Sequence, residues 1–132
     1  MGRALGLYTD PYQEFGFLSF DMWRACRLVV DTGMHNGHMT REEAIQFMLD
    51  NTSLTRTDVE AEIDRYIAYP GQALAYKAGQ LDLLRLRDRA KAALGPKFDI
   101  RAFHDAVLLD GPMPLSILDA KIGRWIAAGG QN

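Results

Sequence analysis

The sequence predicts an all-α protein, an irregular bundle of about six helices. Apolar residues recur at three- and four-residue spacing through most of the chain. No alternating apolar run bounded by hairpin turns appears, so the signals for strands are nearly absent. The chain has 132 residues, of which 48% are hydrophobic and 24% charged, and a chain of that size and composition can bury one core. We therefore expect residues 1–132 to form a single all-α domain.

The first helix is expected to begin at Pro11 and to end between Gly33 and Gly37. Asp10 is a good N-cap, and proline suits the first helical position. Two glycines and an asparagine then interrupt the apolar pattern, which indicates the end of the helix. The apolar residues of this helix keep three-to-four spacing: Phe15, Leu18, Met22, Trp23, Cys26, Val29 and Val30.

Two shorter helices are expected next. Thr40 and Glu43 match a capping box, which predicts a helix over residues 41–50. Thr55 with Asp58 begins another helix, and the pair Tyr69-Pro70 ends it because a residue before proline disfavours the α region. The side chains expected to face inward on this second helix are Val59, Ile63, Tyr66 and Ile67.

Three further helices complete the prediction. A long one runs from about Gln72 to Leu94 and ends at the following Gly-Pro pair. Asp99 caps a short helix that continues to about Leu109, and Pro114 opens the last one.

Charge and composition argue against several classes of partner. The net charge is −2 and the basic residues are spread along the chain, whereas nucleic-acid binding needs a clustered basic face. No apolar stretch is long enough to span a bilayer, and the N-terminus lacks the order of a signal peptide. The compartment stays open between cytoplasm and periplasm, because the single cysteine forms no internal disulfide.

Two of the histidines could belong to a metal site. His35 and His38 lie three apart, and Asp31 lies four before His35, so an unbroken helix would place all three on one face. Gly33 and Gly37 interrupt this stretch, and a closed zinc site needs a fourth ligand. The sequence favours loop histidines, and we assign no metal ligand in this chain.

The segment YIAYPGQALAYK, residues 66–77, places three tyrosines, a glutamine and a lysine around a Pro-Gly break. A helix start of this kind exposes amide donors, and Gln72 and Tyr76 share a face because they are four apart. A phenol there can donate a hydrogen bond to a developing oxyanion. The spacing alone fits equally well with tyrosines that cap a helix corner.

Arg24 and Arg27 lie three apart on an otherwise apolar helix, with Asp31 four after Arg27. This polar stripe could be solvated, with an Arg27–Asp31 pair contributing a few tenths of a kcal/mol. A guanidinium on such a helix could instead point into a cleft and hold a carboxylate. Both alternatives stay open from composition alone.

Three blocks of the sequence carry a family resemblance. They are WRACRLVVDTGMH (residues 23–35), YIAYPGQALAYKAG (66–79) and FDIRAFHDAVLLDGPMPLSIL (98–118). Their order and spacing resemble the C-terminal part of the bacterial domain of unknown function 885 family, from about Leu7 to Ile126. That family is similar to helical zinc metallopeptidases of the gluzincin type. The resemblance therefore implies the C-terminal half of a helical zincin-like fold.

The resemblance also implies roles for individual residues. Family members carry their zinc motif upstream, so zinc is expected in the complete family domain and no cofactor in this chain. This chain resembles the part of the family domain that lines the substrate cleft, and it is expected to be inactive alone. By resemblance, His35 and Tyr76 would stabilise the transition state in a complete protein. Residues that match the family blocks and would bind the peptide substrate are Arg24, Arg27, Gln72 and Lys77.

One departure from the family pattern affects His35. Family sequences often read like H-x-x-G-W-T after the histidine, whereas this chain has His38 and Met39 in place of the glycine and the tryptophan. The loop after His35 is therefore expected to be placed differently, which weakens a role for His35 more than one for Tyr76.

Two other functions fit the same sequence. The chain could be a stand-alone helical module that binds a protein or peptide, or a subunit that completes a peptidase site with a partner chain. The first helix carries more aromatic residues than one helix of a small bundle needs, namely Phe15, Phe17, Phe20 and Trp23. We expect a homo-oligomer or a partner chain to cover this aromatic face.

Overall fold

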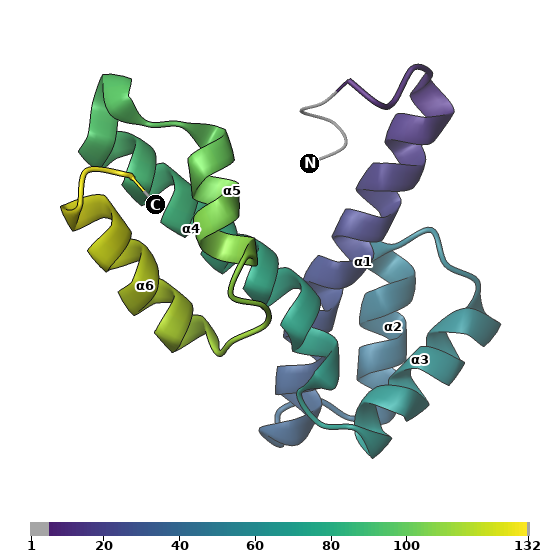
Figure 1. Ribbon diagram of the computed structural model, residues 1–132. Coiled ribbons are helices and arrows are strands. Elements are labelled where there is room, and N and C mark those ends of the chain that lie inside the picture. The colour runs from purple at the N-terminus through teal and green to yellow at the C-terminus, as the bar shows by residue number, and fades with distance from the viewer. Residues whose placement is uncertain (1–5, 132) are drawn as a thin grey trace. The chain divides into compact units, whose positions relative to one another are not determined.

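The computed structural model describes residues 6–131, and within that range every regular element is helical (Figure 1). This confirms the predicted all-α class with six α-helices, to which two short 3₁₀ helices are added. The elements are α1 (Pro11–His35), α2 (Arg41–Asn51), α3 (Arg56–Ala68), η2 (Gln72–Leu74), α4 (Ala75–Leu94), η3 (Gly95–Lys97), α5 (Ile100–Leu108) and α6 (Leu115–Ala127). None of these helices is long and apolar enough to cross a membrane.

Local capping explains where the helices begin. The capping box of α2 is complete, because the Thr40 amide donates to Glu43 Oε2 at 2.7 Å and the Glu43 amide donates to the Thr40 hydroxyl at 3.3 Å. Three further predicted caps also accept amide hydrogen bonds: Asp10 at α1, Thr55 at α3 and Asp99 at α5. Each of these side chains satisfies donors that the first helical turn leaves unbonded.

The start of the long helix differs from the prediction. One helix was expected from Gln72, but a single 3₁₀ turn, η2, precedes α4. Gly71 has a φ of 79°, a left-handed conformation that glycine adopts without strain, and the Leu74 amide donates to its carbonyl at 3.2 Å. The tight turn buries the Ala73 side chain completely against α1.

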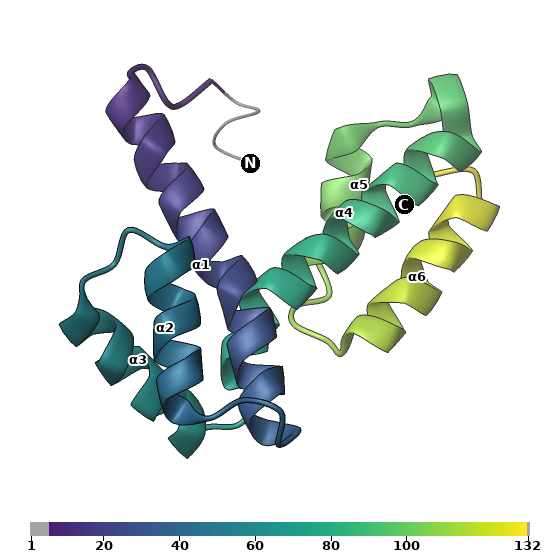
Figure 2. The same cartoon turned by 180° about the vertical axis from the view of Figure 1, so that it is seen from behind.

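The chain divides into two compact units, and each has its own core. The first unit extends to Ala78 and contains α1, α2, α3 and η2; both views show α2 beside α1 and α3 (Figures 1 and 2). Its core residues are Cys26, Val30, Ala44, Ile45, Met48, Val59, Ile63, Tyr66 and Ala73. That residues 1–132 form one domain stays a prediction.

The second unit begins at Gly79 and contains most of α4 together with α5 and α6. Its buried residues are Leu86, Ala90, Phe103, Ala106, Leu118, Ile122 and Trp125. The Phe103 and Trp125 rings meet edge to face, with their centroids 6.1 Å apart, an arrangement that aromatic pairs favour.

Helix α1 is buried along only part of its length. Its buried residues all lie between Cys26 and Asp31, whereas Phe15 and Phe20 nearer its start are 62% and 53% exposed. The predicted apolar stripe of α1 therefore continues beyond the packed region. On α3 the predicted inward residues are buried except Ile67, which is 45% exposed because it lies about 100° around the helix from Tyr66.

This difference within α3 gives a direct test of the first core. Ile63 is fully buried, so Ile63→Ala is expected to lower the free energy of unfolding by about 2–5 kcal/mol. Ile67→Ala on the same helix should cost about 1 kcal/mol or less. Urea denaturation of the 132-residue chain followed by circular dichroism measures both, and equal losses would contradict the packing.

Candidate functional site

A stripe of residues at four-residue spacing runs along one face of α1. Trp23, Arg27, Asp31 and His35 share this face because residues four apart in an α-helix are neighbours. The buried charged residues within 6–131 are Arg27 and Asp31, which are 7% and 2% exposed. Arginine and aspartate are almost never buried without partners, so their partners define the site.

Arg27 is held by two residues of α3. Its Nε donates to the Tyr66 hydroxyl at 2.8 Å, and its Nη2 donates to Glu62 Oε2 at 3.2 Å. The Tyr66 hydroxyl in turn donates to Glu62 Oε2 at 2.6 Å and accepts from Trp23 Nε1 at 3.1 Å. Arg65 Nη2 also donates to Glu62 Oε2, at 2.8 Å. We call these five residues the Tyr66 network.

The Tyr66 network corrects one of the sequence alternatives. Arg27 does not pair with Asp31 along α1, and it is not solvated; it holds the Glu62 carboxylate of this same chain. Glu62 and Tyr66 were missed as site residues. Their four-residue spacing on α3 is a signal for a local pair, but nothing local points to Arg27, which precedes Glu62 by 35 residues.

The pKa values of Glu62 and Tyr66 are shifted in the directions that suit the hydrogen bond between them. Burial alone raises the pKa of Glu62, but the hydrogen bonds from Arg65 and Tyr66 outweigh it, and the net pKa lies below the usual range. Burial, and then the bond to Glu62, raises the pKa of Tyr66. At neutral pH Glu62 is therefore an acceptor and Tyr66 a donor to it.

Tyr76 lies against the buried guanidinium. The Cζ atom of Arg27 is 4.4 Å from the centroid of the Trp23 ring and 5.4 Å from that of Tyr76, both within the range of cation–π attraction. Tyr76 is 52% exposed, and its hydroxyl bonds to no residue in the described part of the chain. The structure therefore fixes one face of this ring and leaves the phenol accessible.

Asp31 and His35 form a second cluster one helical turn further along α1. His35 Nδ1 lies 2.8 Å from the Asp31 carbonyl oxygen and 3.0 Å from Asp31 Oδ1. The pKa of His35 is raised, first by the Asp31 carbonyl and also by the Ile67 carbonyl. The Gly71 amide donates to the same Asp31 Oδ1 at 3.1 Å.

Two other predicted site residues, Gln72 and Lys77, form bonds within the first unit. Gln72 Oε1 accepts a bond of 2.7 Å from Arg65 Nη1, which joins it to the Tyr66 network. Lys77 Nζ lies 2.8 Å from Asp21 Oδ1, and its side chain is only 13% exposed. The Gln72 and Lys77 side chains are therefore each bonded to another residue of this chain.

Arg24 stands apart from the other candidates. Its guanidinium lies 5.8 Å from the centroid of the Phe20 ring, and its Nη1 donates to the Phe20 carbonyl at 3.4 Å. It pairs with no carboxylate of residues 6–131. Of the predicted residues, the structure thus brings Arg27 and Tyr76 together and connects Gln72 to the Tyr66 network through Arg65, but it leaves Arg24 outside.

The donor set of a metal site is not assembled in this part of the chain. Over residues 6–131, no three His, Cys, Asp or Glu side chains are grouped so that they could hold an ion. His35 is the last residue of α1 rather than a loop residue as expected, and it bonds locally to Asp31. His38 lies beyond the end of the helix and is exposed. The residues that the structure describes therefore do not fit a zinc ion.

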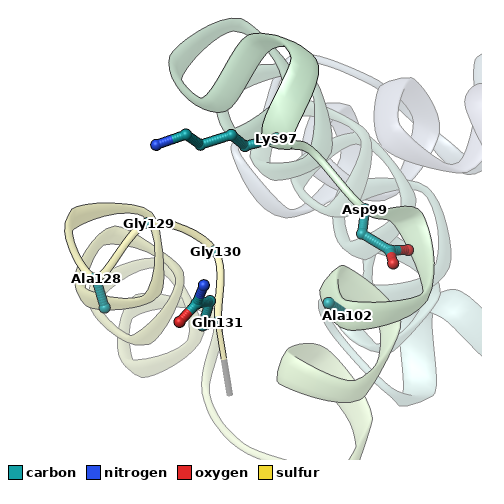
Figure 3. Close-up of a pocket in the computed structure, with 7 residues that line it drawn as sticks. All are labelled: Lys97, Asp99, Ala102, Ala128, Gly129, Gly130 and Gln131. Atoms are coloured by element: carbon teal, nitrogen blue, oxygen red, sulfur yellow. The ribbon is translucent and has the colours of Figure 1, made fainter.

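The second unit has a hollow of about 750 Å³, lined by Lys97, Asp99, Ala102 and residues 128–131 (Figure 3). The Asp99 carboxylate already accepts the Arg101 amide at 2.7 Å as the cap of α5. None of the candidate catalytic or binding residues predicted from the sequence lines this hollow. The candidate site is therefore the face of α1 in the first unit.

The family model for "Bacterial protein of unknown function (DUF885)" matches residues 1–122. The chain belongs to the DUF885 family. This DUF885 chain is similar to a protein from Colwellia psychrerythraea, described as a putative lipoprotein, whose crystal structure is known. The two are 49% identical with a TM-score of 0.92, and the match covers 96% of this chain but only 22% of that one. No curated protein matches the chain.

The predicted family is thereby confirmed. The relation of DUF885 to gluzincin-type peptidases and the C-terminal placement of this segment stay predictions. The DUF885 chain spans about a fifth of the length of its Colwellia relative.

The pKa of Glu62 gives the site a predicted dependence on pH. A carboxylate whose pKa is lowered on folding stabilises the fold above the unfolded value of about 4.3 and loses this effect as pH falls through its folded pKa. Glu62→Gln should cost about 1.5–3 kcal/mol at pH 6, because it weakens four hydrogen bonds to a charged acceptor.

Urea unfolding at pH 6 and at pH 3 measures this effect, and the difference from wild type should shrink at the lower pH. Glu60→Gln is the matched control on α3, because Glu60 forms only a surface pair with Arg56. A deficit of Glu62→Gln that is the same at both pH values would contradict the assignment.

Proposed function

We propose that this chain forms the substrate-facing part of a zinc-metallopeptidase-like DUF885 protein and is inactive alone. The resemblance of its three sequence blocks to that family supports the reaction class. The observation that carries the proposal is the position of Tyr76, an accessible phenol whose ring is fixed against a buried arginine.

Tyr76 has the properties of a preorganised hydrogen-bond donor. Its hydroxyl has no partner within residues 6–131, so it can donate to a substrate oxygen without first breaking a bond to another described residue. Arg27 beneath the ring is held by Glu62 and Tyr66, which limits movement of the ring as charge develops. A donor fixed before the reaction stabilises a developing oxyanion more than one that must reorganise.

The remaining candidates are assigned to binding and orientation. Arg24 offers a guanidinium that pairs with no described carboxylate, which suits a carboxylate of a peptide substrate. Arg27 belongs to the Tyr66 network beside Tyr76, and Gln72 bonds to that network through Arg65. Lys77 anchors the start of α4 on Asp21. We assign His35 as a second, charge-stabilising group held by Asp31.

The metal chemistry of this proposal does not use the described residues. Since their donor side chains do not gather into a zinc site, ligands would come from outside residues 6–131. We assign no step of hydrolysis to a metal ion held by this segment.

An interaction module is the second candidate function. The exposed apolar residues on the first half of α1, with Tyr12, Phe15, Phe20 and Met22 between 50% and 87% exposed, favour it. A surface of this kind marks a contact with another protein surface more often than a solvated face. In this case the chain would bind a partner or a second copy without any transition-state chemistry.

A chimera tests the peptidase proposal. The chain replaces the matching segment of the Colwellia relative, and the chimera is incubated with zinc and a peptide library whose products are identified by mass spectrometry. Tyr76→Phe should lower kcat about 100- to 1000-fold with little change in KM, because it removes one oxyanion donor.

Tyr69→Phe is the matched control, since Tyr69 lies in the turn between α3 and α4 and is 65% exposed. An unchanged kcat in Tyr76→Phe would remove Tyr76 from the mechanism. Peptide cleavage by the 132-residue chain unaided would overturn the proposal, and the absence of any cleavage by chimera and parent would favour the interaction module.

A further inference from the structure

We infer that Asp31 is a positioning residue for Tyr76, and that it acts by holding the backbone of the turn between α3 and α4. We call residues 69–74 the Gly71 corner, which contains the left-handed Gly71 and the 3₁₀ turn η2. The inference concerns how Tyr76 is placed, and its mechanistic consequence rests on the proposed function.

The Gly71 corner is exposed but tied to α1. Gly71 itself is exposed, and its amide donates to Asp31 Oδ1 at 3.1 Å across 40 positions of sequence. The other backbone bonds of the corner are local, from Tyr69 to Arg65, from Gln72 to Tyr69 and from Leu74 to Gly71. Local hydrogen bonds determine the shape of a turn but do not fix its position on the rest of the fold. The hydrogen bond from the Gly71 amide to Asp31 fixes the position of the corner on α1.

The corner and α1 are in register at three points. Asp31 holds the Gly71 amide, Arg27 contacts the Tyr76 ring, and Ala73 between them is fully buried. Asp31 and Arg27 are one helical turn apart on the same face of α1, a rise of about 6 Å for four residues. A shift of the corner along α1 would therefore move Tyr76 off its guanidinium.

The way Asp31 is buried indicates which of its atoms matter. Asp31 is 2% exposed, and its Oδ2 accepts no hydrogen bond from the described residues. Burying a carboxylate is costly, and His35 next to Oδ1 offsets part of that cost. The positioning role therefore needs only the acceptor at Oδ1, which an asparagine also provides.

Hydrogen exchange measured by NMR on the 132-residue chain tests the placement without any assay of activity. The wild-type Gly71 amide should exchange at least about tenfold more slowly than in an unfolded peptide, although Gly71 is exposed. Asp31→Asn should keep this protection and the chemical shifts of the Tyr76 ring. Asp31→Ala should lose the protection and shift the Tyr76 ring signals.

An unprotected Gly71 amide in the wild type would overturn the inference, and this outcome is available even if Asp31→Ala fails to fold. A folded Asp31→Ala variant with unchanged Tyr76 signals would overturn it as well. So would an Asp31→Asn variant in which the Gly71 protection is lost.

Kinetics of the chimera separate this inference from the proposed function. In a His35→Ala background, which removes the other group that Asp31 holds, Asp31→Ala should lower kcat at least about tenfold more than Asp31→Asn. In that background, adding Asp31→Ala to Tyr76→Phe should cause little further loss, because both then act through one phenol. Additive losses would contradict positioning through Tyr76. A silent Tyr76→Phe would remove the proposed function, while Gly71 exchange would still decide the structural role of Asp31.

Discussion

The buried positive charge of Arg27 is the constraint on which the first unit depends. A charged residue that is only 7% exposed must find acceptors within the protein, and α3 supplies them in Glu62 and the Tyr66 hydroxyl. The charge therefore fixes α3 against α1 in one register. Apolar burial of Val30, Ile45 and Ile63 supplies contact area, but apolar contacts alone select register less strictly.

The same charge connects the fold to the candidate site. The N–H groups of Arg27 donate to Tyr66 and Glu62. Its planar guanidinium contacts the rings of Trp23 and Tyr76. A side chain that stabilises the core thus also orients an accessible phenol. Asp31, one helical turn away, holds the backbone that leads to Tyr76 through its hydrogen bond with the Gly71 amide. Core stability and placement of the site are therefore coupled along one face of α1.

The sequence predicted the fold well because the signals for it are local. Asp10, the Thr40–Glu43 box and the Tyr69-Pro70 pair act within a few residues, and the helix bounds follow them closely. The candidate site was predicted only in part. Tyr76 and Arg27 were singled out from their spacing and received roles through the family resemblance, but Glu62 was missed because its partner lies 35 residues away on another helix. The η2 turn was missed for a similar reason, since burial of Ala73 against α1 is a tertiary effect.

A double-mutant cycle between Arg27 and Tyr66 tests the central claim most directly. The free energy of unfolding is measured for wild type, Arg27→Met, Tyr66→Phe and the double variant. Residues joined by a buried bond of 2.8 Å should couple by about 1–3 kcal/mol. Losses that add to within about 0.3 kcal/mol would contradict the account, because α1 and α3 would then be held together without the Tyr66 network.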